Sequence, residues 1–149
     1  MGGLVPRAHS NRRDEAVVMI ADNDVVAGRR TAVALAECSV AGEPHMVHDG
    51  LEALEFAFCT GRHSTRTQRL ELIFLDAALP LLDGMEVLRR LKNSDAARHI
   101  PVMVTGPPDE DLELEALSLG AEGHVPKPVR CDSMAEILRN LGLVPAGEQ

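Results

Sequence analysis

Short apolar runs alternate along this sequence with longer segments in which apolar residues recur at helical spacing. Five runs are typical of buried strands, and a helix is expected after each. The expected strands cover 16–21, 44–49, 70–76, 100–105 and 121–127, and the expected helices cover 25–37, 50–61, 84–94, an acid-rich stretch ending at Gly120, and 131–142. Apolar strands that alternate with helices form a parallel sheet covered on both faces, so the pattern predicts an α/β fold of the doubly wound (βα)5 type, a three-layer sandwich.

The composition provides a core with few aromatic side chains. Hydrophobic residues make up 45% of the 149 residues, but there are three Phe, no Tyr and no Trp, so aliphatic side chains and Met must fill the interior. Apolar stripes on the first two helices predict core positions. These positions are Val26, Val33, Leu35, Leu51, Leu54 and Phe58.

Turn and cap residues support these boundaries. Gly120 is expected as a C-cap glycine and Asp83-Gly84 as a turn and cap, and Asp132 or Ser133 is expected to cap the last helix. Residues 15–143 are predicted to form one domain. The segment 1–14, in which LVPR resembles a protease-site remnant, is predicted to be a disordered leader, and 144–149 a flexible tail.

Charge and cysteine content narrow the class of protein. The formal net charge of −8 argues against non-specific nucleic-acid binding and against an anionic membrane surface. No apolar run approaches the about 20 residues of a membrane span, and no secretory signal is visible, so a cytoplasmic location is expected. The three cysteines lie far apart with no CxxC spacing, so neither a zinc site nor a disulfide is expected.

Four polar residues fall at the ends of predicted strands. Asp22 follows the first strand, Asp76 ends the third, Thr105 ends the fourth and Lys127 ends the fifth. The carboxyl ends of parallel strands meet at one edge of the sheet. Two carboxylates, a hydroxyl and an ammonium there predict a phosphoryl site: one Asp as nucleophile, the other helping to hold a hard cation, and the hydroxyl and ammonium binding phosphoryl oxygens. Turn or cap roles for the aspartates, and a strand-end role for Thr105, remain open.

The segments VVMIADND, LIFLDAALPLLDGMEVLRRLK, IPVMVTG and LGAEGHVPKP together resemble the receiver domain of two-component response regulators, over about residues 16 to 142. The resemblance implies a flavodoxin-like fold with sheet order 2-1-3-4-5, the order known for a chemotaxis regulator of this family. The loop 61–69 and the IPV and KPV segments look most like single-domain regulators paired with bacterial phytochromes.

The resemblance assigns a role to each residue that matches the family motif. Asp76 matches the phosphoacceptor, and Asp22 matches one of the acidic pair that binds Mg²⁺. The main-chain carbonyl of Ala78 matches the third protein ligand of the metal. Thr105 matches the switch hydroxyl, and Lys127 matches the lysine that pairs with the acyl phosphate. The Lys127-Pro128 bond matches a peptide bond that is usually cis in this family.

Several positions depart from the family pattern. Ala21 stands where the first acidic residue of the pair is expected, which predicts weaker Mg²⁺ binding, and Asp24 is one step too far into the turn to replace it readily. The fourth strand is one residue short, and counting back from Gly120 favours Thr105 over Gly106 as the switch residue.

Three further positions bear on the conformational switch and on the lifetime of the acyl phosphate. His124 replaces the usual Tyr or Phe, which suggests a weaker or pH-sensitive switch. Pro126 fits the fifth strand if that strand lies at the sheet edge. The positions two after Asp76 and two after Thr105 are Ala78 and Pro107, which carry no polar group to orient water, so a long-lived acyl phosphate is expected.

The favoured interpretation is a stand-alone receiver, a phosphoacceptor and not an enzyme in the usual sense. The resemblance implies a histidine kinase as partner, with a phytochrome-type kinase as a candidate. The signal would be passed on by contact with a downstream protein, by formation of a homodimer, or by transfer of the phosphoryl group to another protein. Two alternatives are a degenerate receiver that acts only as an interaction module, motivated by Ala21 and His124, and a flavodoxin-like domain for a small ligand. The second lacks a phosphate-cradling loop after the first strand.

Overall fold

The computed structural model describes residues 16–145 and contains a five-stranded parallel sheet with the order β2-β1-β3-β4-β5. The predicted doubly wound, flavodoxin-like fold and strand order are therefore confirmed. The strands are β1 (Ala16–Ala21), β2 (Glu43–Val47), β3 (Arg69–Asp76), β4 (Val102–Gly106) and β5 (Gly123–Pro126). The helices are α2 (Val25–Glu37), α3 (Gly50–Phe58), the 3₁₀ turn η1 (Gly61–His63), α4 (Gly84–Lys92), α5 (Glu110–Ser118) and α6 (Cys131–Asn140). The predicted leader 1–14 and most of the predicted tail 144–149 lie outside the described residues.

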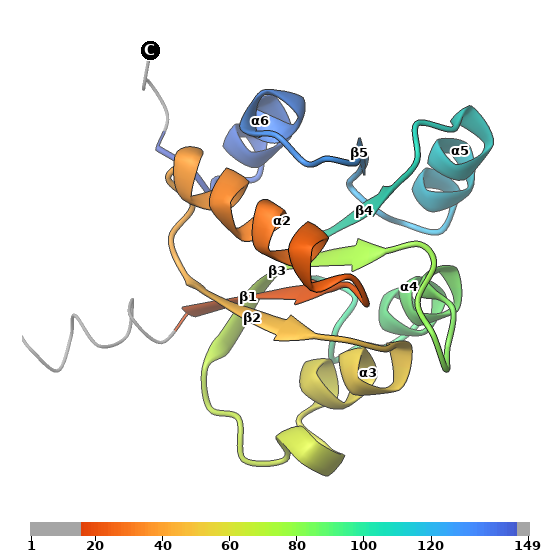
Figure 1. Cartoon of the computed structure of the whole chain (residues 1–149). Helices are drawn as coiled ribbons and strands as arrows, with labels where there is room; N and C mark the ends of the chain where they lie inside the picture. Colours follow the sequence, from red (N-terminus) through yellow and green to blue (C-terminus); the bar gives the residue numbers. More distant parts are fainter. Residues whose placement is uncertain (1–15, 146–149) are drawn as a thin grey trace, which may run out of the picture.

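The sheet separates two hydrophobic cores, because alternate side chains of each strand point to opposite faces. Val17 and Met19 of β1 pack with residues of α3, α4 and α5, whereas Val18 and Ile20 pack with residues of α2 and α6. Figure 1 shows α2 and α6 above the sheet and α3 and α4 below it. Helices on both faces explain why β1 and β3 are almost continuously apolar.

The predicted stripes of α2 and α3 were partly wrong. Leu35 is buried, but Val26 and Val33 are 65% and 57% exposed, and Leu51 is 45% exposed. The faces that contact the sheet carry smaller side chains, such as Ala34 on α2 and Ala53 on α3. The larger valines and leucine therefore lie on the outer faces of the two helices.

Aspartates cap four helices. The side chains of Asp24, Asp49, Asp83 and Asp109 each accept a hydrogen bond from backbone N–H groups of the first turn that follows. Asp83 therefore has the expected cap role. The expected cap of α6 was wrong: Arg130 occupies the N-cap position, without a side-chain bond, and Asp132 lies in the first turn. The helix begins at Cys131, the first residue of the predicted range, so the N-cap falls on Arg130 and not on a residue inside that range.

Proline residues lie in both outer strands of the sheet. Pro44 is in β2, opposite Val18 of β1, and Pro126 is in β5, opposite Gly106 of β4. The expectation that Pro126 belongs to an edge strand is confirmed. An edge strand tolerates proline where its missing N–H would have faced away from the neighbouring strand.

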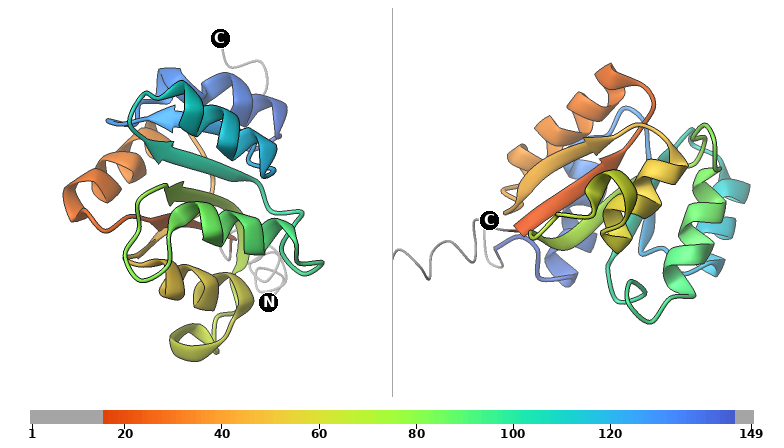
Figure 2. Two further views of the ribbon diagram at one scale, coloured as in Figure 1. Left: turned by 90° about the vertical axis from the view of Figure 1, so that its right-hand side faces the viewer. Right: turned by 90° about the horizontal axis from the view of Figure 1, so that it is seen from below.

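The segment after α3 is held by contacts around Phe56. Its ring stacks on the ring of His45 with centroids 4.4 Å apart, and the ring of His63 meets it edge-on at 4.9 Å. The guanidinium of Arg66 lies 4.8 Å from the same ring and donates a hydrogen bond from Nε to the Phe56 carbonyl. Burial, followed by the neighbouring His63, lowers the pKa of His45. Figure 2 shows this segment projecting beside α3.

Cys38 and Cys131 form a disulfide, contrary to the expectation from their spacing. Cys38 is the C-cap residue of α2 and Cys131 is the first residue of α6. The two residues are 93 positions apart in sequence, yet packing of α2 beside α6 brings their Cα atoms to 5.4 Å, within the range that a disulfide spans. A pairing created by the packing of two helices has no local sequence signal.

Candidate phosphoryl-transfer site

Backbone hydrogen bonds fix the carboxyl ends of four strands at one edge of the sheet. Asp22 follows β1 and donates from its N–H to Val47 of β2 at 3.0 Å. Asp76 ends β3 in register with Thr105 of β4, and Ala77 N–H donates to the Thr105 carbonyl at 2.9 Å. Lys127 follows β5. The four residues predicted from the strand ends thus lie along one edge.

The ammonium of Lys127 joins the two carboxylates. Its Nζ lies 2.8 Å from Asp22 Oδ2 and 3.1 Å from Asp76 Oδ2. Asp22 is 4% exposed and Asp76 is 8% exposed, so both ions are almost fully withdrawn from water. A buried charge is costly unless it is paired. The contact with Lys127 therefore explains how Asp22 and Asp76 can lie at the ends of the buried strands β1 and β3.

The backbone holds the remaining carboxylate oxygens. The Asp24 N–H donates to Asp22 Oδ1 at 2.9 Å, and the Ala78 N–H donates to Asp76 Oδ1 at 3.4 Å. Asp24 itself accepts hydrogen bonds from the N–H groups of Val26 and Ala27 through Oδ1. One oxygen of the Asp24 carboxylate is thus used in capping α2.

Burial has opposite effects on the two kinds of charge in this site. Burial raises the pKa of Asp76, and the hydrogen bond and charge of Lys127 oppose that rise without cancelling it. Burial alone would lower the pKa of Lys127, but its hydrogen bonds with Asp22 and Asp76 outweigh burial and raise that pKa. Lys127 therefore stays protonated at neutral pH, as a residue that binds an anion must.

The two carboxylates suit a magnesium ion. Asp22 and Asp76 point toward one common atom, Lys127 Nζ, and Mg²⁺ is commonly held by one or two carboxylates while it keeps several waters. Ala21 is 1% exposed and offers no side-chain oxygen. Within residues 16–145 no group of three or more His, Cys, Asp or Glu is placed to hold a metal, so the fit rests on the pair Asp22 and Asp76, and the Ala78 carbonyl stays a predicted third ligand.

Two features of strand β5 and its exit also bear on the site. The Lys127-Pro128 bond is cis, as expected. His124 lies in β5 opposite Val104, and its Nε2 atom is buried without a hydrogen-bond partner among the described residues. An unpaired buried donor or acceptor carries a desolvation cost, so this imidazole gains if it moves to a polar partner.

Close packing beneath Asp76 was missed by sequence reasoning. A Cβ atom on Gly84 would lie 2.1 Å from the main-chain oxygen of Asp76, and one on Gly50 would lie 1.9 Å from that of Leu82. Gly84 therefore positions the loop that follows the phosphoacceptor candidate. The only local signal was the Asp83-Gly84 pair, which also suits an ordinary turn.

The family is established by comparison with known proteins. Residues 18–139 match the response regulator receiver domain, and the chain belongs to this family of two-component signalling proteins. Receiver domains are generally not enzymes of the usual kind. No helix in residues 16–145 has the length and apolar character that crossing a membrane requires.

Individual relatives agree with this assignment. The chain is 34% identical over 93 residues to the polar-differentiation response regulator DivK of Brucella anthropi, covering 62% of this chain and 69% of DivK. Two further curated relatives are longer proteins, of which the chain spans 45% and 35%. The bacteriophytochrome response regulator AtBRR superposes with a TM-score of 0.76 at 32% identity, covering 87% of this chain and 94% of AtBRR. The Mn²⁺-bound response regulator Rcp1 gives 0.71 at 25% identity, covering 87% and 99%.

Proposed function

We propose that Asp76 accepts a phosphoryl group from a phospho-histidine of a partner kinase, with Mg²⁺ beside it, and that the receiver signals through protein–protein contacts. The observation that carries this proposal is the ammonium of Lys127, held 2.8 Å from Asp22 Oδ2 and 3.1 Å from Asp76 Oδ2. Lys127 is a cation that can turn from Asp76 Oδ2 to a phosphoryl oxygen once a divalent cation neutralises the two carboxylates.

The transfer needs a nucleophile and groups that bind charge. A carboxylate oxygen of Asp76 forms a bond to phosphorus while the bond from phosphorus to the kinase imidazole breaks, and the electron pair of that bond stays on the imidazole nitrogen. Lys127 exchanges its contact with Asp76 Oδ2 for a phosphoryl oxygen, and the Thr105 hydroxyl donates to another. Asp22, Asp76 and the Ala78 carbonyl would hold Mg²⁺, which would supply positive charge for the phosphoryl oxygens.

Phosphorylation then acts on the neighbouring elements. The phosphoryl group adds charge and strong hydrogen-bond acceptors beside Thr105, which lies in β4 next to the edge strand β5. Movement of Thr105 toward it would reshape the surface made by α5, β5 and α6, which is the expected contact face for a downstream protein or a second copy. Likeness to AtBRR supports a phytochrome-type kinase as partner, and the Mn²⁺ in Rcp1 supports a divalent cation here.

The test is labelling with acetyl phosphate, with and without Mg²⁺, read by intact mass and peptide mapping. The expected result is one phosphoryl group on Asp76 that requires Mg²⁺ and is absent in Asp76→Asn. Beryllofluoride should shift the NMR signals of Thr105 and Lys127 in the same Mg²⁺-dependent way. An unlabelled wild type with a competent donor, or a label on another residue, would refute the proposal.

A second candidate is a phosphorylation-independent interaction module. The observation that favours it is Ala21, which is 1% exposed and removes one acidic ligand from the cation site. The variant Ala21→Asp separates the two functions. If Mg²⁺-dependent labelling appears only after this substitution, the natural chain acts as a module. If the natural chain is labelled and the variant only binds Mg²⁺ more tightly, phosphorylation is the function.

A further inference from the structure

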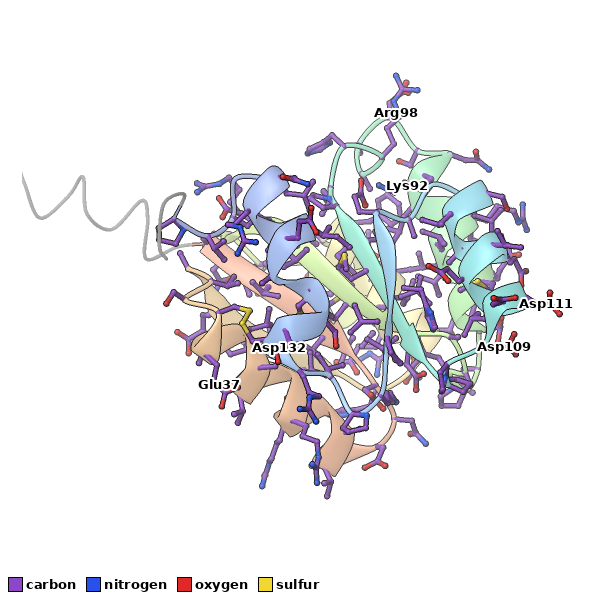
Figure 3. All side chains as sticks on the ribbon, turned by 90° about the horizontal axis from the view of Figure 1, so that it is seen from above. Glu37, Lys92, Arg98, Asp109, Asp111 and Asp132 are labelled. Atoms are coloured by element: carbon purple, nitrogen blue, oxygen red, sulfur yellow. A yellow bond between two sulfur atoms is a disulfide. The ribbon has the colours of Figure 1, made fainter. Side chains whose placement is uncertain are left out.

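The disulfide between Cys38 and Cys131 lies away from the phosphoryl site, and nothing in the proposed transfer uses it. Figure 3 shows the yellow sulfur–sulfur bond between α2 and α6, with Glu37 and Asp132 labelled beside it. Cys38 ends α2, and Cys131 begins α6, four residues after Lys127. The bond thus ties α2 to the helix that follows the lysine of the site.

The fold does not depend on this cross-link for a core. Disulfides are a structural necessity mainly in small secreted domains that cannot bury enough apolar surface. Here two clusters of buried side chains line the two faces of the sheet, and the α2–α6 cluster contains Phe74, Met103, Met134 and Leu138 among others. A disulfide that a well-packed domain does not need is a candidate for a reversible one.

The structure also accommodates the reduced state. In the oxidised structure the Cys38 sulfur lies 3.6 Å from the Cys131 carbonyl oxygen, which is an acceptor close to the place of a Cys38 thiol when the bond opens. Both cysteines are half-buried and border a hollow of about 200 Å³ whose wall includes Ser39 and Arg139. A small thiol or disulfide can therefore approach the sulfur atoms from solvent.

We propose that Cys38 and Cys131 form a reversible redox site that latches α6 to α2. The oxidant is a low-molecular-weight disulfide of the glutathione class. One protein thiolate attacks it and releases one reduced thiol; the second protein thiolate then attacks the mixed disulfide and releases the other. The net reaction oxidises two protein thiols and reduces one disulfide to two thiols. Cys131, at the positive end of the α6 dipole, is the better placed thiolate.

The latch acts on the phosphoryl site through the segment between β5 and α6. A groove of about 350 Å³ runs between Asp24, Ala27 and Arg30 of the α2 end and Lys127, Pro128 and Val129. One wall belongs to the start of α2, and the other is the segment that leads from β5 into α6, so both walls are continuous with the helices that the disulfide joins. The oxidised latch holds Lys127 against Asp22 and Asp76, and the reduced form lets the segment move. This second part rests on the proposed function.

The experiment incubates the full chain with oxidised glutathione or dithiothreitol and follows thiols by alkylation and mass, and unfolding by calorimetry. Oxidation should remove two thiols together, map to Cys38 and Cys131, leave no glutathione adduct, and be reversed by dithiothreitol without denaturant. The reduced protein should melt about 10 °C lower. Cys59→Ser, which alters the remaining free cysteine, should behave as wild type, whereas Cys38→Ser should show no redox dependence of melting.

A stable glutathione adduct on either cysteine, a bond that opens only in denaturant, or equal melting of both forms would overturn the proposal. Labelling by acetyl phosphate should fall about 3- to 10-fold on reduction in wild type and Cys59→Ser alike. Equal phosphorylation of the oxidised and reduced protein would refute the proposed effect of the disulfide on Lys127. If neither the oxidised nor the reduced protein is phosphorylated, only the proposed function is refuted. The redox site is tested independently by the thiol masses and the melting temperatures.

Discussion

Adding one methyl group at Gly84 should cost far more stability than adding one at Gly28. A Cβ on Gly84 would lie 2.1 Å from the main-chain oxygen of Asp76 and 2.9 Å from the Cα of Ala77, and the backbone offers no side chain that could swing away. The closest of these distances is about 0.9 Å short of the 3.0 Å limit below which Cβ contacts are essentially not found. Overpacking costs about 1–3 kcal/mol, and a rigid carbonyl places Gly84→Ala near the upper end, at about 2–3 kcal/mol.

Gly28→Ala is the matched control, because it also adds a methyl group to a helix. The new Cβ would lie 3.4 Å from the flexible Met46 side chain and 3.8 Å from the Cβ of Asp22, which are ordinary contacts. Removing a glycine from the interior of α2 favours the helix by about 0.8–1.0 kcal/mol. We therefore expect this variant to be more stable than wild type by about 0.5–1 kcal/mol.

Urea unfolding of the oxidised protein measures both effects. With a slope of about 2 kcal/mol per molar, the midpoint of Gly84→Ala should fall by about 1–1.5 M and that of Gly28→Ala should rise by about 0.3–0.5 M, at unchanged slopes. The two midpoints should lie on opposite sides of wild type. A Gly84→Ala midpoint at or above wild type would show that the Asp76 loop yields freely, and the argument from close packing would fail.

Four further predictions concern charge and lifetime. Asp76→Asn in metal-free buffer should raise Tm by about 2–4 °C at pH 7.5, because burial raises the pKa of Asp76 and so penalises its ionised form; the gain should shrink as the pH falls and wild-type Asp76 binds a proton. Lys127→Met should cost about 2–3 kcal/mol in urea at pH 7, somewhat less than for a fully buried pair because Lys127 is 27% exposed, and the cost should diminish toward acidic pH as Asp76, whose pKa burial raises, binds a proton. His45→Gln should reduce the loss of Tm between pH 7.5 and 5.5: the folded-state pKa of His45 is lowered, so its unfolded state binds more protons and stability is lost as the pH falls. Acyl phosphate on Asp76, followed by intact mass, should persist for minutes or longer, because Ala78 and Pro107 offer no polar side chain to orient water.

Each of these has a contradicting outcome. A lower Tm for Asp76→Asn would mean that its contact with Lys127 outweighs burial. Unchanged unfolding of Lys127→Met would mean that water already solvates the carboxylates. An acid sensitivity of His45→Gln equal to that of wild type would assign the effect to other groups. Loss of the phosphoryl group within seconds would show that another group activates water.

The fold could be predicted because the signal for it is periodic and repeated. The strand 16–21 and the helix 25–37 were predicted with the observed bounds, and the other strands were displaced by one or two residues at their ends. The rule that strand ends share an edge then placed Asp22, Asp76 and Lys127 together, as the ion pairs show. Their roles in phosphoryl transfer remain predictions that labelling must test.

The features that sequence reasoning missed depend on distances between separate elements. The outward faces of Val26, Val33 and Leu51 follow from how closely each helix approaches the sheet, which periodicity does not specify. The disulfide between Cys38 and Cys131 requires α2 and α6 to be side by side, and the contact of Gly84 with Asp76 requires the turn to fold back onto its own strand.

The prolines of the two outer strands have a consequence for how these molecules can meet. Pro44 and Pro126 stand at positions of the edge strands where the backbone N–H would point away from the sheet. Each edge of the sheet therefore lacks one of the N–H groups that a strand from another molecule would have to pair with. Extension of the sheet by edge-to-edge pairing with a strand of another molecule is therefore disfavoured at both edges. Reversible encounters between copies are left to helical surfaces, so crowded solutions of this protein should stay free of fibrils while the fold is intact.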